Sequence, residues 1–294
     1  MQKGLFKVKK STLLLLLAPG VLIYLFVVVV PLFNSLIYSF TDWTIGPNKN
    51  FIGLANYSSL LRDRVFWQAL WHNLFIVFFN VTVQMAIAFL LTVLYTSKAT
   101  KFQAFHRTVI FLPVVLSAVV VGYIWQMIYS GNYGILNAIL RFVGMEGLIR
   151  PWLDSPSVVL GAVTVPLIWQ YLGVPLIIFM SAVQGIPKDI YEVCDLDGVT
   201  GVQRAAYITF PLIVDSIKVT IMLSISSNML VFTHIYVLTG GGPGTSSMVL
   251  AQYAYNTSFA KMQLGYGSTI SIAIFVVSFT IVLLFRKLTG GKAE

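Results

Sequence analysis

The stretch TLLLLLAPGVLIYLFVVVVPLF, residues 12–33, decides the fold class. It is a nearly unbroken run of apolar side chains, long enough to cross the roughly 30 Å of hydrocarbon in a bilayer as a helix. Similar runs recur along a chain that is 57% hydrophobic and 10% charged, whereas soluble domains carry about 25% charged residues. The sequence therefore predicts an all-α, polytopic transmembrane helical protein.

Six apolar segments predict six spans within a single transmembrane domain, residues 1–294, at about residues 13–39, 70–96, 108–129, 158–183, 213–239 and 267–286. The first segment is similar to a signal peptide. Its apolar run exceeds the roughly 7–15 residues usual there, and no A-x-A cleavage site follows. We therefore expect it to be retained as the first helix.

The basic residues predict the orientation of the chain. Most of the 19 lysines and arginines lie near the two termini and in the connections between spans two and three and spans four and five. Cytoplasmic segments carry this excess, so both termini and the loop 184–211 are expected in the cytoplasm. The same scatter argues against nucleic acid as a partner, despite a net charge of +9.

The loop contains the stretch PKDIYEVCDLDGVTGVQRAAYITFPL, residues 187–212, with four of the ten acidic residues of the chain. Its pattern predicts a short helix with an apolar stripe that includes Val193 and Cys194. Gly198 can end that helix in the left-handed conformation, and Pro211 is expected to stop a second helix just before the fifth span.

From these residues alone, two interpretations of the loop stay open. One is a docking element that presents apolar and acidic groups to a partner in the cytoplasm. The other is an ordinary polar loop whose carboxylates balance the nearby Lys188 and Arg204.

The stretch YEVCDLDGVTGVQRAAYITFPLI resembles the EAA motif of permease subunits in ABC-type importers. Glu192, Gly198 and Pro211 match its characteristic positions, while Val193 and Cys194 stand where alanines are usual. Residues 236–272, YVLTGGGPGTSSMVLAQYAYNTSFAKMQLGYGSTISI, resemble the connection between the last two spans in sugar permeases of the maltose and glycerol-phosphate importer type. The similarity runs from about residue 12 to residue 288.

The resemblance implies the permease core of a type I, binding-protein-dependent sugar importer in the inner membrane of a bacterial cell. It implies that the loop couples the spans to a separate ATPase through Glu192, Val193, Cys194, Asp197, Gly198 and Pro211. The implied partners are a second homologous permease, two copies of an ABC ATPase subunit, an extracytoplasmic sugar-binding protein and the lipid bilayer. ATP and Mg²⁺ would be bound by the ATPase subunits, with no cofactor in this chain.

The glycine-rich stretch GGGPG, residues 240–244, could suggest a phosphate-binding loop. That motif requires a lysine before Ser or Thr, and no lysine follows here. We expect a tight turn outside the membrane instead. The resemblance implies that this turn faces the binding protein through Gly240, Gly241, Gly242 and Pro243.

Polar residues within the spans are the candidates for a solute pathway. Ser224, Ser227 and Asn228 share one face of the fifth span, and the other candidates are Asn80, Gln84, Tyr123, Gln126 and Gln170. Amide and aromatic groups suit the hydroxyls and apolar ring faces of neutral sugars. The alternative is hydrogen bonding that only holds helices together, and both interpretations stay open.

Two other functional classes would require features that this sequence lacks. A secondary transporter or channel for a small polar solute, working without an ATPase, would require ionisable residues within the spans or an inverted repeat. An intramembrane enzyme would require converging catalytic groups. The sequence offers none of these, its three histidines are widely separated, and its single cysteine argues against a cysteine-based metal site. No catalytic or metal-binding residue is predicted.

Overall fold

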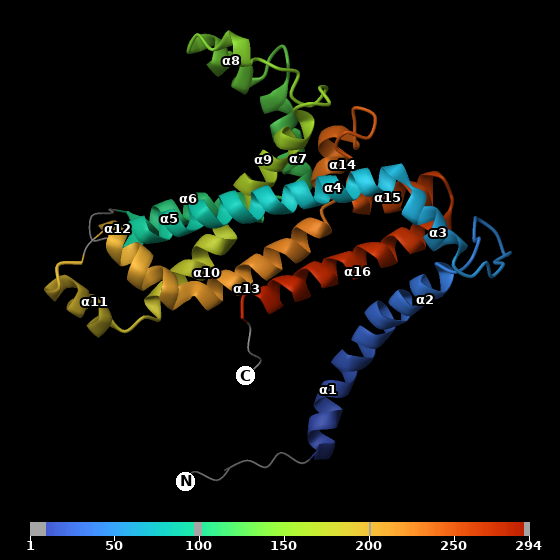
Figure 1. Cartoon of the computed structure of the whole chain (residues 1–294), viewed down its shortest axis with the longest axis horizontal. Coiled ribbons are helices and arrows are strands. Elements are labelled where there is room, and N and C mark those ends of the chain that lie inside the picture. Colours follow the sequence, from blue (N-terminus) through green and yellow to red (C-terminus); the bar gives the residue numbers. More distant parts are fainter. Residues whose placement is uncertain (1–9, 97–101, 200, 291–294) are drawn as a thin grey trace. The chain divides into compact units, whose positions relative to one another are not determined.

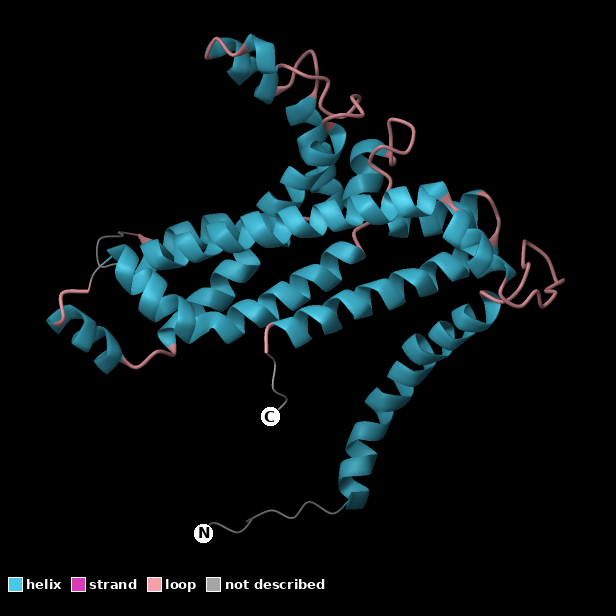
Figure 2. Ribbon diagram, viewed as in Figure 1, coloured by secondary structure: helices cyan, strands magenta, loops and turns pink. Residues whose placement is uncertain are grey.

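The computed structural model describes residues 10–96, 102–199 and 201–290. These residues form helices joined by loops (Figure 2), and none of them belongs to a β-strand, although an isolated bridge joins Thr41 and Phe51. The predicted all-α class is confirmed. The chain divides into two compact units, which are residues 1–62 with 254–273 and residues 63–253 with 274–294.

The described residues contain four continuous helices long and apolar enough to cross a membrane, Ser11–Tyr38, Arg64–Thr96, Gly201–Met229 and Leu264–Leu288. Two further spans are bent pairs. Gln103–Val115 and Ala118–Tyr129 meet at 101°, and Val159–Tyr171 and Gly173–Gln184 meet at 41°. Six spans result if each bent pair counts as one. The third and fourth predicted spans are therefore broken helices.

The first unit begins with α1 (Lys10–Tyr24), the π-helical turn η1 (Leu25–Val29) and α2 (Val30–Tyr38), which together form one long helix. Its apolar side chains are exposed along its length, as with Leu15 at 77%. Exposed apolar side chains suit contact with lipid. The helix also satisfies its own backbone hydrogen bonds, as a segment within the bilayer must. The unit also contains α3 (Ala55–Arg62), η5 (Asn256–Ala260) and the beginning of α16 (Leu264–Leu288).

The polar turn after α2 is held by side-chain and backbone hydrogen bonds. The Asn56 Nδ2 atom donates to the carbonyl oxygens of Ser39 and Thr41, at 2.9 and 2.8 Å. The Gly265 N–H, near the start of α16, donates to the Trp43 carbonyl at 2.8 Å. A Cβ at Gly265 would lie 2.1 Å from the Thr41 carbonyl oxygen, so this close backbone approach requires glycine.

The second unit starts at Asp63, whose carboxylate accepts from the N–H groups of Val65 and Phe66 and caps the next helix. Its elements are α4 (Arg64–Phe79), η2 (Asn80–Gln84), α5 (Met85–Thr96), α6 (Gln103–Val115), α7 (Ala118–Tyr129), α8 (Ile135–Phe142), η3 (Glu146–Leu148), α9 (Val159–Tyr171), α10 (Gly173–Gln184), α11 (Lys188–Leu196), α12 (Gly201–Arg204), η4 (Ala205–Thr209), α13 (Phe210–Met229) and α14 (Thr233–Thr239), with α15 (Leu250–Tyr255) and α16 shared between the units.

Two buried apolar clusters hold this unit together. Met85, Phe179 and Ile213 join α5, α10 and α13. Ile76, Leu167 and Ile235 join α4, α9 and α14. Each cluster thus packs halves of broken spans (α9, α10 and α14) against continuous spans.

The fifth predicted span, residues 213–239, is broken. α13 ends at Met229, residues 230–232 leave the helix, and α14 begins at Thr233. The side-chain amide of Asn73 donates to the carbonyls of Asn228 and Met229, at 3.1 and 3.3 Å. The Asn228 carbonyl also accepts from the Val231 N–H at 3.3 Å, and the Asn73 amide adds a second side-chain bond at the end of α13, where carbonyls lose the partners that the next turn would supply.

The prediction that Pro211 stops a separate helix is wrong. The helix is continuous from Gly201 to Met229, and Pro211 lies in the first turn of α13, directly after the π-helical turn η4. A π turn bonds residue i to residue i+5, as the Phe210 N–H does to the Ala205 carbonyl. The widened turn accommodates a residue that lacks an N–H.

Candidate functional site

The helix α11 is the core of the predicted coupling loop. Figure 1 shows it as a separate short helix, joined by loops to α10 and α12. It ends as the sequence predicts: Gly198 has φ +69°, the Val199 N–H donates to the Cys194 carbonyl at 2.9 Å, and the Gly198 N–H donates to the Asp195 carbonyl at 3.4 Å. This pair of bonds is the Schellman motif, which favours glycine at the left-handed position.

The predicted apolar stripe of α11 is divided between two faces. Cys194 is 5% exposed, whereas Val193 is 55% exposed, and Leu196, which was not part of the predicted stripe, is 87% exposed. On the inner side, Ile186 and Tyr191 pack against the apolar cluster of α5, α10 and α13. The loop is therefore anchored to three spans while it presents apolar side chains outward.

One acidic residue of the loop is balanced within the chain. The Arg204 guanidinium pairs with Asp195, donates to the Val199 carbonyl at 3.3 Å and lies 5.8 Å from the centre of the Tyr191 ring. In the described residues Glu192 and Asp197 form no ion pair, and both are exposed. Asp189 is likewise exposed and forms no ion pair among the described residues, so the polar-loop interpretation accounts for Asp195 but not for the other three carboxylates.

A cavity of about 370 Å³ brings together most of the predicted pathway residues. Asn80 and Gln84 reach it from η2, and Ser224, Ser227 and Asn228 reach it from α13. The other lining residues are Met85, Ala118, Leu167, Tyr171, Val174, Pro175, Ile178, Thr220, Leu223, Leu230, Val231, Phe232, Thr233 and His234. Among these described lining residues His234 is the only histidine, and none is an aspartate, glutamate, lysine or arginine.

The amide nitrogens at the cavity are bonded to backbone carbonyls. Asn80 donates to Ile76 at 3.1 Å, Gln84 to the Ile168 carbonyl at 3.4 Å and Asn228 to Ser224 at 2.8 Å. Within the described part of the chain, no donor is bonded to the amide oxygens of Asn80, Gln84 and Asn228. Each oxygen can accept a hydrogen bond from a hydroxyl group in the cavity.

Three other predicted pathway residues do not line this cavity. Tyr123, on α7, is 59% exposed. The Gln126 amide donates to the carbonyls of Val237 and Leu238, at 2.7 and 3.2 Å, and so links α7 to α14. Gln170 is buried behind the cavity wall, where its Oε1 atom accepts from His234 Nε2 at 2.5 Å.

The pathway prediction missed four other polar residues of the lining, Tyr171, Thr220, Thr233 and His234. A continuous fifth span would place His234 one turn beyond Val231, near the face of Ser224, Ser227 and Asn228, and it lines the cavity although the helix is broken at residues 230–232. No group of three or more His, Cys, Asp or Glu residues that could hold a metal ion occurs among residues 10–96, 102–199 and 201–290.

The glycine-rich turn has the backbone that the sequence predicts. Gly240, Gly241 and Gly244 have φ values of +61°, +90° and +61°, and the Ser247 hydroxyl donates to the Gly242 carbonyl at 2.7 Å. Gly241 is buried against Met248, while Gly242 and Pro243 are partly exposed. The turn is thus fixed internally and still offers surface.

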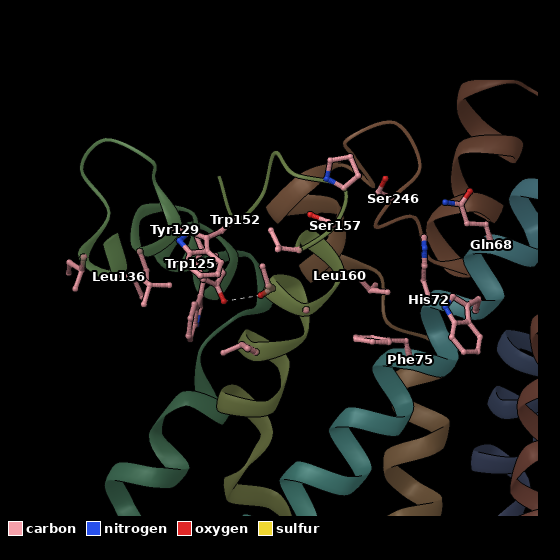
Figure 3. Close-up of a pocket in the computed structure, with 18 of the residues that line it drawn as sticks. Gln68, His72, Phe75, Trp125, Tyr129, Leu136, Trp152, Ser157, Leu160 and Ser246 are labelled. Atoms are coloured by element: carbon pink, nitrogen blue, oxygen red, sulfur yellow. Dashed lines mark hydrogen bonds between the residues drawn. The ribbon is translucent and has the colours of Figure 1, made fainter. Parts of the chain in front are cut away.

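A larger cavity, of about 950 Å³, contains none of the predicted site residues. Figure 3 shows Trp125, Tyr129 and Trp152 gathered on one side of it and His72 and Phe75 on the other. The Tyr129 hydroxyl donates to the Ala162 carbonyl at 2.9 Å. The lining of this larger cavity is mostly aromatic and aliphatic.

The described residues thus define a multi-pass helical membrane protein with an uncharged polar cavity among broken spans. The chain is 34% identical, over 95% of its length and 97% of the other chain, to "Probable ABC transporter permease protein YurN" of Bacillus subtilis. It is 29% identical, over 95% of its length and 90% of the other chain, to the sulfoquinovosyl glycerol transport system permease protein SmoG of Agrobacterium fabrum. No protein-family model matches.

The fold is also found in a solved structure. A chain of a bacterial alginate ABC transporter, crystallised with an alginate-bound periplasmic protein, superposes with a TM-score of 0.83 at 21% identity, covering 95% of this chain and 94% of that one. The chain belongs to the family of ABC transporter permeases, as its relation to YurN over nearly its whole length shows.

Proposed function

We propose that this chain is the membrane-spanning subunit of an ATP-driven importer, and that it translocates a carbohydrate delivered by an extracytoplasmic binding protein. Family membership supports the transport role. Similar chains include permease proteins for diacetylchitobiose in Streptomyces coelicolor and for arabinooligosaccharides in Bacillus subtilis, each 28% identical to this one. The observation that carries the proposal here is the cavity beside Asn80, Gln84 and Asn228.

The lining of that cavity suits a neutral, hydroxyl-rich solute. Amide oxygens and serine hydroxyls accept or donate hydrogen bonds without charge. Tyr171 and Phe232 add aromatic surface for the apolar faces of a sugar ring. The absence of carboxylates and lysine or arginine side chains from the described lining gives no support to an ion-coupled carrier.

The loop around α11 is the proposed contact with the ATPase. Its outward face combines exposed Val193 and Leu196 with the carboxylates of Glu192 and Asp197, which form no ion pair with any described residue. On this proposal the loop and both chain termini are cytoplasmic, as the basic residues favour. The termini themselves, residues 1–9 and 291–294, lie outside the described residues.

The other proposed partners follow from the resemblance of the motifs. A second, homologous permease completes the pathway, and two ATPase subunits bind ATP and Mg²⁺. The binding protein docks outside on the turn that contains Gly240, Gly241, Gly242 and Pro243. ATP drives such a transporter only because it binds its conformations with different affinities. On this proposal the α11 loop transmits the resulting movement of the ATPase to α5, α10 and α13.

Purification of the tagged chain from its native membranes tests this function. We expect an ATPase subunit, a second permease and a binding protein to be identified by mass spectrometry in the same complex. A panel of neutral mono- and oligosaccharides, with uronates as the charged comparison, is then screened for stimulation of ATP hydrolysis. A stable, transport-competent protein without an ATPase subunit would overturn the proposal.

A further inference from the structure

The three helix breaks of the second unit meet at one side chain. Gln170 lies in the last turn of α9, just before the break at Leu172 that separates α9 from α10. Its Nε2 atom donates at 2.8 Å to the carbonyl of Leu116, in the break between α6 and α7. Its Oε1 atom accepts at 2.5 Å from His234, the second residue after the break between α13 and α14.

These bonds form in the interior of the unit. Gln170 is 1% exposed and His234 is 3% exposed. A carbonyl left at a helix break within a membrane lacks the partner that the next turn would supply, and water is not there to replace it. The Gln170 amide therefore fills the missing position at Leu116 and, with its other end, fixes the beginning of α14.

The same breaks form part of the cavity wall. Ala118, the first residue of α7, lines the cavity, as do Tyr171 at the end of α9 and residues 230–234 between α13 and α14. A solute in the cavity thus contacts the segments whose directions Gln170 fixes, and His234 contacts both the cavity and Gln170.

α13 connects this arrangement to the coupling loop. The helix is continuous from Gly201 to Met229, and Arg204 at its beginning pairs with Asp195 of α11. At its other end, Asn73 bonds to the carbonyls of Asn228 and Met229. A displacement of α11 is therefore carried along one helix to the break that His234 and Gln170 hold.

We propose that Gln170 is a positioning residue that joins the three broken helices, so that they change direction together when the ATPase moves the α11 loop. This inference rests on the proposed function. The two hydrogen bonds of Gln170 stabilise one arrangement of the three breaks. Each hydrogen bond between membrane helices contributes only a modest free energy. Loss of both shifts the balance between two arrangements by roughly tenfold.

The test uses the purified complex with its partner subunits in lipid nanodiscs. A reporter, Ser227→Cys, is placed at the cavity in a Cys194→Ser background, and its rate of labelling by methanethiosulfonate ethylammonium is measured without nucleotide and after trapping with ATP and vanadate. We expect the two rates to differ clearly in the parent protein. In Gln170→Met, which is similar in size and lacks both bonds, we expect the ratio of rates to fall roughly tenfold.

Thr164→Val is the matched control. Thr164 is also buried in α9, and its hydroxyl bonds only within that helix, to the Leu160 carbonyl at 2.7 Å. The ratio should be retained in this variant. Gln170→Glu keeps an oxygen for His234 but cannot donate to Leu116 when ionised, so its ratio should be intermediate, and this variant carries the test if Gln170→Met does not assemble.

The outcomes separate the inference from the proposed function. A parent complex that contains the ATPase but shows no nucleotide-driven change in labelling counts against the proposed function. A parent complex that responds, with Gln170→Met or Gln170→Glu retaining the ratio within about twofold, overturns the role of Gln170.

Discussion

Replacement of Gly198 probes the coupling loop at its most constrained position. Gly198 has φ +69°, and no atom lies within 4 Å of a Cβ built on it. The cost of Gly198→Ala is therefore backbone strain without steric clash. A left-handed conformation costs an L-residue about 1–2 kcal/mol, which lowers the population of the correct helix end by roughly 5- to 30-fold.

The variants of Gly198 should follow an order set by tolerance of that conformation. Asparagine adopts it most readily, alanine less so, and a β-branched residue is a genuine outlier there. We expect Gly198→Asn to retain most transport, Gly198→Ala to lose much of it and Gly198→Val to lose nearly all. The Schellman bonds of Val199 and Gly198 should weaken in the same order.

The assay is solute uptake per ATP hydrolysed by the complex in proteoliposomes. Gly161→Ala is the control, because Gly161 lies in α9 without positive φ and without a neighbour within 4 Å of its Cβ position. This variant should couple normally. Equal coupling in the glycine, alanine and valine proteins would refute the role of the loop geometry.

Three other changes have distinct expected results. Asn228→Ala removes an amide oxygen from the cavity and should raise the half-saturating solute concentration by roughly 5- to 10-fold in uptake assays, whereas Ser226→Ala, outside the cavity lining, should not; equal values would favour a purely structural role for Asn228. Gly265→Ala places a Cβ 2.1 Å from a backbone oxygen and should destabilise the fold by about 1–3 kcal/mol. Its melting temperature should therefore be lower than that of the control Gly20→Ala. An unchanged melting temperature would contradict the close approach. Arg204→Met removes the contacts with Asp195 and Val199. Because the ion pair is partly exposed, the uptake of solute per ATP hydrolysed should fall by only about 2- to 5-fold, with Lys188→Met as the charge-matched control. An identical uptake per ATP in these two variants would argue against the Arg204 contacts.

Local features explain what the sequence predicts well. Apolar run length alone predicts the six spans, and glycine at the end of a short amphipathic helix predicts the left-handed Gly198. The predicted pathway residues Ser224, Ser227 and Asn228 are three and four residues from Ser224, so one helix face brings them to the same cavity. Each of these inferences requires only residues close together in the sequence.

The sequence analysis did not identify the helix breaks at Leu116, Leu172 and Leu230. Two of them carry local signals, because Ser117 caps α7 and Pro175 lies in the first turn of α10, but the contacts that hold the breaks join distant residues. The breaks are stabilised by Gln170, 54 residues from Leu116, and by Asn73, 155 residues from Asn228.

Proline shows a different limit of local rules. The expectation that Pro211 ends a helix assumes α-helical geometry before it, and the π turn η4 removes that condition. Pro31 is accommodated in the same way after η1. Nothing in the side chains of these turns marks them as π-helical from sequence alone.

Photo-crosslinking from α11 tests the central claim most directly. A benzoylphenylalanine replaces Leu196, which is 87% exposed on α11, or, as the control, Phe142, which is 92% exposed on α8. Irradiation of the complex in native membranes should link position 196 to the ATPase subunit and leave position 142 without that product. A complex that contains the ATPase but gives no such product from position 196, or gives it equally from position 142, would contradict the assignment of α11 as the site of coupling.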